Sequence, residues 1–202
     1  FQGMSPNQYW SFVPNPAYNG TKTTLKKVVF DYESSVTSEF ASLKNGQVNI
    51  GYIDPTMVGS QSQLSGVKLT PQYGWQFDYA QINETGKGPG ATKYFNQPYV
   101  RQALQMGVDQ LGMIKHLQHG YGVPTIETVP SQPPNTIYDK SLKNPWPYSP
   151  ANGQKLLEQH GWKMQKGVLT KNGTKFAFTF VYVTGSPIVQ YEAELLKQDW
   201  LK

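Results

Sequence analysis

Hydrophobic residues recur every three or four positions in the middle of the chain, between Pro98 and Gly120. This spacing is typical of an amphipathic helix. Pro98 suits the first helical turn, where its missing N–H has no partner to lose, and Gly120 followed by Pro124 is a stop signal. We therefore predict one long helix whose apolar face forms the middle of the core. The residues on that face are Val100, Leu104, Val108, Leu111, Ile114 and Leu117.

The N-terminal part alternates strand and helix patterns. Aromatic and polar residues alternate over 7–18 and then break at Asn15-Pro16, which predicts a strand entering a turn. Residues 25–32 and 48–53 are rich in β-branched and aromatic residues and are predicted strands. Between them Ser34 or Ser35 caps a short helix. A strand, a helix and a strand within about thirty residues predict a βαβ unit with parallel strands.

The following segments carry weaker or more mixed signals. Residues 54–70 predict a short helix and a connection, and residues 73–83 alternate like a strand. The stretch 86–90 is rich in glycine, but no Gly-Lys-Ser/Thr follows, so we predict a flexible turn rather than a phosphate loop. Residues 124–150 are rich in proline and are expected to be extended.

The C-terminal part predicts two helices and a hairpin. Ser149 caps the first helix, with Pro150 at its first position and Gly161 at its end. An Asn172-Gly173 type I′ turn then leads into a predicted strand over 175–183. Ser186 caps the last helix and Pro187 opens it.

Composition excludes several classes of protein. Hydrophobic residues make up 38% and charged residues 15% of the chain, so it is globular rather than disordered. The formal charge of +5 is dispersed, which gives no support for a nucleic-acid partner. The absence of cysteine excludes thiolate zinc sites and a cysteine nucleophile. No apolar run approaches the ~18 residues that cross a bilayer. The aromatic content of 13% fits either ordinary packing or a surface that stacks on a polar ligand.

Candidate catalytic and metal chemistry is sparse. His116 and His119 lie three residues apart and share a helix face, but no third ligand is near in sequence, so solvated side chains are the favoured interpretation. Arg101 and Asp109 are eight residues apart, too far for a helical pair, and each is expected to anchor a neighbouring loop. No nucleophile elbow, zinc-protease motif or P-loop is present. We expect no enzyme activity, no metal and no cofactor.

Several ordered motifs resemble one family. Tyr94-Phe95-Asn96, then Val100-Arg101-Gln102-Ala103-Leu104, then Val108-Asp109 and Gly120-Tyr121-Gly122 are similar to the signature region of the peptide/nickel-type (family 5) extracellular solute-binding proteins of ABC transporters. Gln110 stands where many members have arginine, and Gly107 where many have alanine. Asn15–Gly20, residues 41–50 and Tyr148-Ser149-Pro150 with Gly161-Trp162 resemble further elements, with Gly153 in place of the usual alanine.

The resemblance implies a fold and a domain organisation. The fold expected is α/β, a lobe like those of the type 2 periplasmic binding proteins, with a mixed sheet flanked by helices. Residues 1–3 are interpreted as the remnant of a tag, because they precede Met4. Residues 4–202 are then a single lobe, a fragment covering most of the second lobe of a two-lobed protein, and the first lobe of the same protein is a missing partner.

The resemblance also implies a function. The chain is expected to belong to the substrate-binding component of an ABC importer, which captures oligopeptides by closure of two lobes and delivers them to permease subunits in the membrane. Nickel chelates, haem and oligosaccharides are alternative ligands within the family. The expected location is extracytoplasmic, in the periplasm or at the cell surface as a lipoprotein. The alternative from another class is a secreted carbohydrate-binding module or glycoside hydrolase fragment.

The candidate substrate-binding residues come from the same resemblance. The loop before the last helix is expected to reach the ligand cleft: Tyr182, Val183, Thr184, Gly185 and Ser186. In some dipeptide-binding relatives this loop carries an arginine and a tyrosine that hold the ligand's carboxylate, and Val183 and Gly185 stand at the matching positions here. The helix N-terminus behind the loop remains as a weak anion site. Second candidates are Trp75, Asn83, Tyr94 and Asn96, for each of which a role in the core or in a turn is equally open.

Overall fold

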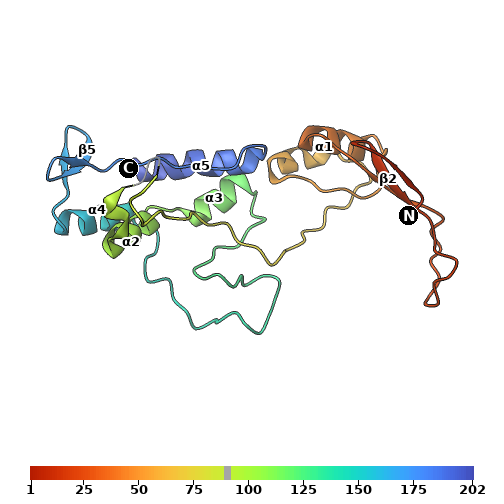
Figure 1. The fold of residues 1–202 in the computed structure, drawn as a ribbon, viewed down its shortest axis with the longest axis horizontal. Helices are drawn as coiled ribbons and strands as arrows, with labels where there is room; N and C mark the ends of the chain where they lie inside the picture. The colour runs from red at the N-terminus through yellow and green to blue at the C-terminus, as the bar shows by residue number, and fades with distance from the viewer. Residues whose placement is uncertain (89–91) are drawn as a thin grey trace. The chain divides into compact units, whose positions relative to one another are not determined.

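The computed structural model describes residues 1–88 and 92–202 (Figure 1). The chain divides into two compact units, Phe1–Leu69 and Thr70–Lys202. Each unit has a hydrophobic core of its own. The predicted turn over 86–90 extends into residues outside the described part, and the single lobe over 4–202 stays a prediction.

The first unit begins with a three-stranded antiparallel sheet of order β1-β2-β3. Its strands are β1 (Gly3–Ser5), β2 (Tyr9–Phe12) and β3 (Val28–Asp31). In the register, Trp10 lies opposite both Met4 and Phe30. β2 and β3 confirm the strands predicted within 7–18 and 25–32. Gly3, assigned to the tag remnant, pairs with Ser11 and so takes part in the sheet.

The helix predicted after these strands is confirmed as α1 (Val36–Lys44). The Ser35 hydroxyl accepts a hydrogen bond from the Ser38 N–H at 3.1 Å, and the Ser38 hydroxyl lies 3.3 Å from the Ser35 N–H, so the two residues form a capping box. A short 3₁₀ helix, η1 (Pro55–Gln63), follows with Asp54 as its cap. The two elements enclose the core of this unit, which contains Phe40, Leu43 and Leu64.

The βαβ unit predicted over residues 25–53 is wrong. Residues 48–53 form no strand, and every ladder in the described part of the chain is antiparallel. Val48 and Ile53 instead pack against the small core, while Ile50 is 92% exposed. The physical reason is that a strand forms only where a neighbouring strand accepts its backbone hydrogen bonds, and no described segment forms a ladder with this one.

The second unit contains most of the helices (Figure 1). They pack around an aromatic core. Its helices are η2 (Lys93–Asn96), α2 (Pro98–Met106), α3 (Gln110–Leu117), α4 (Pro150–Gln159) and α5 (Pro187–Trp200). α2 packs against α4, and Val100, Leu104, Leu157 and Trp162 are buried between these helices and the aromatic residues beside them. The predicted starts of α4 at Pro150 and of α5 at Pro187 are confirmed.

The single long helix predicted from Pro98 to Gly120 is wrong, because the chain breaks between α2 and α3. The Asp109 carboxylate accepts a hydrogen bond from the Gly112 N–H at 2.8 Å and starts a new helix at Gln110. The Asp109 N–H in turn faces the Asp199 carboxylate at 3.3 Å. The cap at Asp109 therefore ends the continuous helix although the apolar period continues. Asp109 was expected to anchor a loop, and its carboxylate instead caps α3.

Two glycines lie where helices approach closely. A Cβ on Gly153 in α4 would lie 2.9 Å from the carbonyl oxygen of Ala103 in α2. A Cβ on Gly107 would lie 2.9 Å from Cδ1 of Trp200, whose indole N–H donates to the Leu104 carbonyl at 3.0 Å. Both glycines therefore lie at positions of close contact, where an added Cβ would force a neighbour to move.

The predicted hairpin is confirmed in part. β4 (Lys163–Gln165), β5 (Val168–Lys171) and β6 (Thr174–Lys175) form an antiparallel sheet of order β4-β5-β6. The turn residues Asn172 and Gly173 have φ angles of 49° and 76°, as a type I′ turn requires. The strand predicted over 175–183 ends at Lys175, and 73–83 forms no strand, because neither stretch has a ladder neighbour among the described residues.

The proline-rich stretch after α3 has no regular element, as predicted, and is held by side-chain hydrogen bonds. The Gln110 carboxamide donates to the Thr125 carbonyl at 2.9 Å and accepts from the Thr125 N–H at 3.0 Å. A side-chain amide supplies both donor N–H groups and an acceptor oxygen, so it can bind the N–H and the carbonyl of one backbone residue. The Gln110 side chain therefore binds both backbone groups of Thr125, as a residue on a neighbouring strand would.

Replacing Gln110 by alanine should remove both hydrogen bonds and lower the free energy of unfolding by about 1–3 kcal/mol, at roughly 0.5–1.5 kcal/mol for each bond. Urea denaturation followed by circular dichroism measures the change. Gln102→Ala, a half-buried glutamine of α2, is the control. If the two variants were equally stable, the bonds to Thr125 would contribute nothing.

Candidate functional site

The loop of residues 182–186 leads directly into α5. Ser186 occupies the N-cap position, and its carbonyl accepts a hydrogen bond from the Gln190 N–H at 3.3 Å. The Ser186 hydroxyl makes no capping bond, and Pro187 has no N–H. The first N–H groups of a helix have no partners within the helix and lie at the positive end of its dipole. The end of this loop therefore offers N–H groups to a carboxylate or a carbonyl oxygen.

The rest of the loop is exposed. Val183 is 79% exposed, and Tyr182 is 40% exposed. Gly185 has a φ of +95°, a conformation that residues with a Cβ rarely adopt. The loop thus presents one aromatic ring, one aliphatic side chain and a glycine turn beside the N-terminus of α5.

Tyr94 holds the segment that leads to this loop. Its hydroxyl donates to the Ala177 carbonyl at 2.7 Å and accepts from the Ala177 N–H at 2.9 Å. Its ring stacks on Phe176 with centroids 5.0 Å apart and meets Trp162 edge-on at 5.1 Å. Burial raises the pKa of the Tyr94 hydroxyl. Tyr94 therefore acts in the core, where it pairs with the chain that continues toward Tyr182.

The three remaining candidates are Trp75, Asn83 and Asn96, and the two asparagines make separate local contacts. Trp75 is 60% exposed. The Asn83 side chain closes its own turn, donating to the Lys87 carbonyl at 2.9 Å and accepting from the Thr85 N–H at 3.1 Å. The side-chain oxygen Oδ1 of Asn96 accepts a hydrogen bond from the side-chain amide of the adjacent Gln97 at 2.9 Å. No hydrogen bond in the described part of the chain joins these three residues to the loop of residues 182–186.

The arginine of the family motif has a local role. The Arg101 guanidinium donates to the Phe95 carbonyl at 2.8 Å and forms an ion pair with Glu84 at 3.1 Å. Both partners precede α2 in the chain, Phe95 in η2 and Glu84 farther toward the N-terminus. The expectation that Arg101 anchors a neighbouring loop is therefore confirmed.

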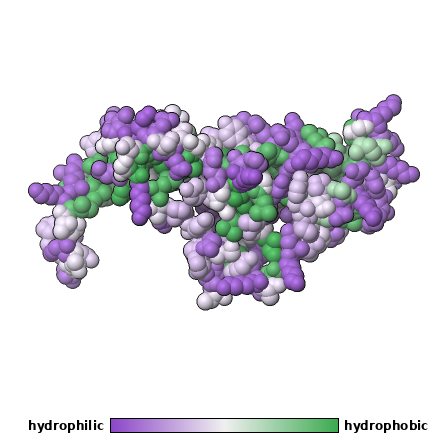
Figure 2. Space-filling model, turned by 180° about the vertical axis from the view of Figure 1, so that it is seen from behind, coloured by the Kyte–Doolittle hydropathy of each residue, from purple (hydrophilic) through white to green (hydrophobic). Residues whose placement is uncertain are grey.

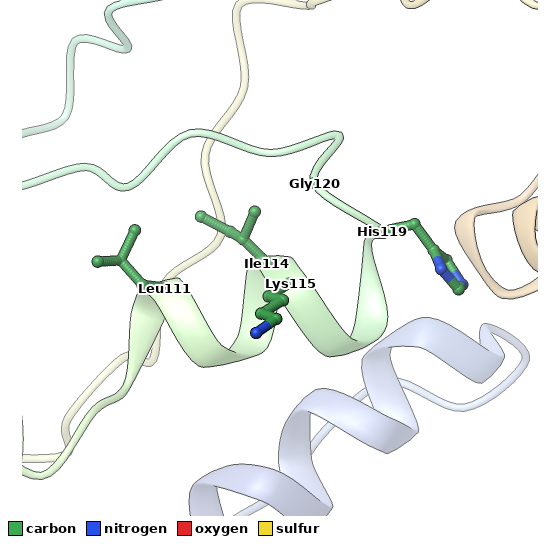
Figure 3. A pocket seen from close by; sticks show the side chains of 5 residues that line it. All are labelled: Leu111, Ile114, Lys115, His119 and Gly120. Atoms are coloured by element: carbon green, nitrogen blue, oxygen red, sulfur yellow. The ribbon is translucent and has the colours of Figure 1, made fainter.

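An open cavity of about 550 Å³ lies along α3 (Figure 3). Its lining residues are Leu111, Ile114, Lys115, His119 and Gly120. Figure 3 shows Leu111 and Ile114 projecting from the same side of the helix, with His119 beyond its C-terminal end. Of the two histidines considered for metal binding, only His119 lines this cavity. Within residues 1–88 and 92–202, no three His, Cys, Asp or Glu side chains gather as metal ligands would.

Glu192 on α5 carries a half-buried carboxyl group that no pattern in the sequence indicated. Glu192 accepts a hydrogen bond from the Gln118 side chain at 3.2 Å. Burial and the negative charge of Asp78 raise the pKa of Glu192, against the opposing effect of the Gln118 hydrogen bond. The separation of 114 positions between Asp78 and Glu192 (192 − 78) explains why no local pattern could reveal the interaction.

Replacing Glu192 by glutamine should stabilise the protein at neutral pH. A raised pKa means that the folded state favours the protonated acid, so stability falls as the pH rises from the value of a free glutamate, about 4.3, through the folded value. Glutamine keeps a polar partner for Gln118 and carries no charge. The difference in unfolding free energy between variant and parent should be smallest near pH 3.5 and larger at pH 7, as urea titrations at the two pH values will show. A difference that does not vary with pH would contradict the assignment.

Two peptide-binding proteins are similar in sequence to most or all of this chain. The oligopeptide-binding protein AppA of Bacillus subtilis (strain 168) is 23% identical over 205 residues, covering 100% of this chain and 36% of AppA. The dipeptide-binding protein of Pseudomonas aeruginosa PAO1 is 25% identical over 181 residues, covering 88% of this chain and 31% of that protein. The chain thus spans about a third of the length of these curated relatives.

Solved structures show the same fold. NikZ from Campylobacter jejuni, in complex with Ni(L-His), superposes with a TM-score of 0.80 at 20% identity over 98% of this chain and 38% of that chain. AppA from Bacillus subtilis, in complex with a nonapeptide, superposes with a TM-score of 0.69 at 21% identity over 100% of this chain and 39% of that chain. The predicted α/β fold of the type 2 periplasmic binding proteins is confirmed.

No helix in the described ranges has the length and apolar character needed to cross a membrane. The motifs around α2 and α4, the fold and the relatives all agree on one group of proteins. The chain belongs to the bacterial extracellular solute-binding proteins of family 5, whose Middle model matches all of residues 1–202.

Proposed function

We propose that this chain is part of the substrate-binding component of an ABC importer that captures oligopeptides. The observation that carries the proposal is the family match over the whole of residues 1–202. Members of this family are solute-binding proteins of transport systems and not enzymes. The carbohydrate-binding or glycoside hydrolase alternative has no support among the relatives.

The proposed ligand is an oligopeptide because several of the relatives are peptide-binding proteins. AppA is an oligopeptide-binding protein and its structure holds a nonapeptide, while the Pseudomonas relative is a dipeptide-binding protein. A nickel chelate is the second candidate, favoured by the TM-score of 0.80 to NikZ with Ni(L-His). Peptide sites of this kind hold the ligand's main chain by hydrogen bonds and tolerate varied side chains through water.

The proposed mechanism is capture outside the cytoplasm, followed by delivery. Two lobes close around the ligand, and the closed protein docks on the permease subunits in the membrane. We place the protein in the periplasm or, as a lipoprotein, at the cell surface. The residues proposed to contact the ligand are Tyr182, Val183, Thr184, Gly185 and Ser186, with Trp75, Asn83, Tyr94 and Asn96 as second candidates. The exposure of Val183 and the free N–H groups at the start of α5 support the first group.

Native mass spectrometry of the full-length protein, purified under mild conditions from its host, tests the proposed function. A co-purified mixture of short peptides is the expected result. A single nickel chelate or sugar would keep the transport function and overturn the peptide. A protein without ligand that instead cleaves a panel of glycans would overturn the transport function.

The proposed site makes a prediction for the full-length protein. Val183→Asp places a negative charge beside the N-terminus of α5, where it competes with a ligand carboxylate or carbonyl oxygen. Affinity for the co-purified peptides should fall at least about tenfold by calorimetry, or about 1.4 kcal/mol. Thermal stability should change little because Val183 is 79% exposed.

Val181→Asp is the matched control, because Val181 is 81% exposed and lies two residues farther from α5. It introduces the same charge on the same extended segment, and its peptide affinity should stay close to that of the parent. Equal losses in the two variants, or no loss in Val183→Asp, would remove the loop from the site.

A further inference from the structure

Lysines are the only charged residues at neutral pH in the long segment between the last turn of α4 and the middle of α5. Residues 159–191 contain four lysines and no aspartate, glutamate or arginine, whereas the formal charge of the whole chain is +5. Most of the excess positive charge therefore lies in this one segment. The lysines are separated by three, five and four positions, so no regular spacing in the sequence places them on a common surface.

The sheet of β4, β5 and β6 brings two of these lysines together. Residues directly opposite each other in an antiparallel ladder lie on the same face. Lys163 lies opposite Thr170, and Thr170 lies opposite Lys175, so the two lysines share one face on either side of Thr170. Because neighbouring strands are about 4.8 Å apart, their Cα atoms are roughly 10 Å apart. Lys166 occupies the turn between β4 and β5. Lys163, Lys166 and Lys175 are named here the lysine surface.

The lysine surface is open to solvent. All three side chains are exposed, and the ion pairs found among residues 1–88 and 92–202 include none of them. Figure 2 shows hydrophilic residues over the right-hand end of the molecule, the end at which Figure 1, seen from the other side, labels β5. The three positive charges are therefore available to a partner outside the second unit.

The opposite face of the same sheet serves the core. Leu169 packs against the aromatic core. The Lys171 ammonium lies 3.4 Å from the Tyr99 hydroxyl and 5.7 Å from the centre of the Tyr99 ring, so the fourth lysine is held by an internal contact. The two faces thus differ in charge and in contacts, and the charges of the lysine surface take no part in the packing of the unit.

We propose that the lysine surface binds the anionic head groups of a phospholipid bilayer. The charges are complementary, and each lysine close to an anionic membrane adds a favourable contribution that salt screens. The residue type agrees with this partner. A lysine ammonium is a compact point charge that requires no fixed geometry, which suits a layer of mobile head groups, whereas arginine suits a fixed carboxylate or phosphate.

A protein or nucleic-acid partner fits this surface less well. Lysine is depleted in the interfaces between proteins. Proteins that bind single-stranded nucleic acids add aromatic side chains that stack on the bases. The ladder residues that share the face with the lysines are neither aromatic nor acidic, and they are Gln165, Val168 and Thr170.

The choice of a membrane rests on the proposed function, since a protein that delivers its ligand to permease subunits works beside a bilayer. A contact between the lysine surface and the bilayer would raise the effective concentration of the protein at the permease, without any further contact between the two proteins. The lysine surface thus supplies a role for a part of the chain that the proposed ligand loop of residues 182–186 does not include.

Sedimentation of the full-length protein with lipid vesicles tests this inference. The protein is prepared without a lipid anchor, so that no acyl chain accounts for the binding. The vesicles contain phosphatidylcholine alone, or phosphatidylcholine mixed with phosphatidylglycerol, whose head group is anionic. The test variant combines Lys163→Gln, Lys166→Gln and Lys175→Gln.

Two further variants serve as controls. The first makes the same change in net charge at exposed positions elsewhere, by combining Lys26→Gln, Lys140→Gln and Lys143→Gln. The second keeps the charge of the lysine surface, by combining Lys163→Arg, Lys166→Arg and Lys175→Arg. All three variants should keep the Tm of the parent, because the substituted side chains are exposed.

The parent should sediment with the anionic vesicles at about 0.1 M salt and remain in solution at about 1 M, because the Debye length falls from about 10 Å to about 3 Å. The test variant should bind the anionic vesicles at least about tenfold more weakly than the parent. The glutamine control and the arginine variant should both stay within about twofold of the parent, since each keeps three positive charges on the lysine surface.

Equal losses in the test variant and the glutamine control would show that the attraction follows net charge alone, and would overturn the inference. Binding to neutral and anionic vesicles alike, or to neither, would overturn it as well. Capture on immobilised polyglutamate without binding to vesicles would assign the surface to an acidic protein instead. Native mass spectrometry separates this inference from the proposed function, because co-purified peptides in a protein that binds no vesicles would leave only the proposed function standing.

Discussion

Replacing Trp162 by alanine should destabilise the second unit more than any other single change we consider. The side chain is 2% exposed and lies in the centre of the aromatic core. Its ring meets Tyr94 edge-on at 5.1 Å and Phe176 at 5.0 Å, and its indole N–H donates to the Tyr99 hydroxyl at 3.3 Å. Losing a buried tryptophan removes its transfer free energy and leaves a cavity, so the free energy of unfolding should fall by about 3–5 kcal/mol.

Chemical denaturation followed by far-ultraviolet circular dichroism measures this loss. Trp146→Ala is the control, because Trp146 is 39% exposed in the proline-rich stretch and its removal should cost less than about 1 kcal/mol. A loss in Trp162→Ala as small as that in the control would mean that the aromatic core does not hold the unit together.

Replacing Gly153 by valine should produce the second largest effect. A Cβ at this position would lie 2.9 Å from the Ala103 carbonyl oxygen, a backbone atom that cannot turn away as a side chain does. Valine adds two further carbons beyond that Cβ, so α4 must move off α2. Overpacking of this kind costs about 1–3 kcal/mol or somewhat more, which exceeds the roughly 0.5 kcal/mol or less that valine gains over glycine in helix propensity.

Asn152→Val is the matched control for Gly153→Val. It places the same side chain one residue earlier in the same helix, at an exposed position. Thermal unfolding should show a clear drop in Tm for Gly153→Val and a small change for Asn152→Val. Equal Tm values would mean that the helices separate without cost and that the close approach of α2 and α4 is not required.

The parts of the fold that depend on local chemistry were predictable from the sequence. Ser35 caps α1, Pro187 opens α5, and Asn172-Gly173 forms the turn between β5 and β6, each as the residue types require. Such signals act over a few residues, because a cap or a turn is satisfied by its own neighbours along the chain.

The extended segments were predicted less well because their structure depends on distant partners. Residues 48–53, 73–83 and 176–183 have the alternation of strands, yet none forms a ladder in the described part of the chain. Alternation indicates which side chains share a face but does not supply the neighbour that accepts the backbone hydrogen bonds. The helix break at Asp109 was not predicted for a different reason. The apolar period continues through Asp109, although this residue also caps α3.

The candidate site could be predicted from the sequence only in outline. The loop of residues 182–186 came from the family pattern, and its exposed place before α5 agrees with the expected geometry, but its contact with a ligand stays a prediction. Tyr94 was named for the ligand, whereas its hydroxyl pairs with Ala177, 83 positions away. The interaction between Asp78 and Glu192 likewise joins distant positions, and only the folded chain reveals it.

The contact between Gly107 and Trp200 constrains how this sequence can diverge. With a Cβ at position 107 only 2.9 Å from the indole ring, a lineage that acquires alanine there must first, or at once, accept a smaller residue at position 200. Replacing Trp200 first is tolerated, because a smaller residue at position 200 only leaves a gap beside Gly107. Position 107 and position 200 should therefore covary among close homologues, and a descendant of this chain should exchange the tryptophan before the glycine.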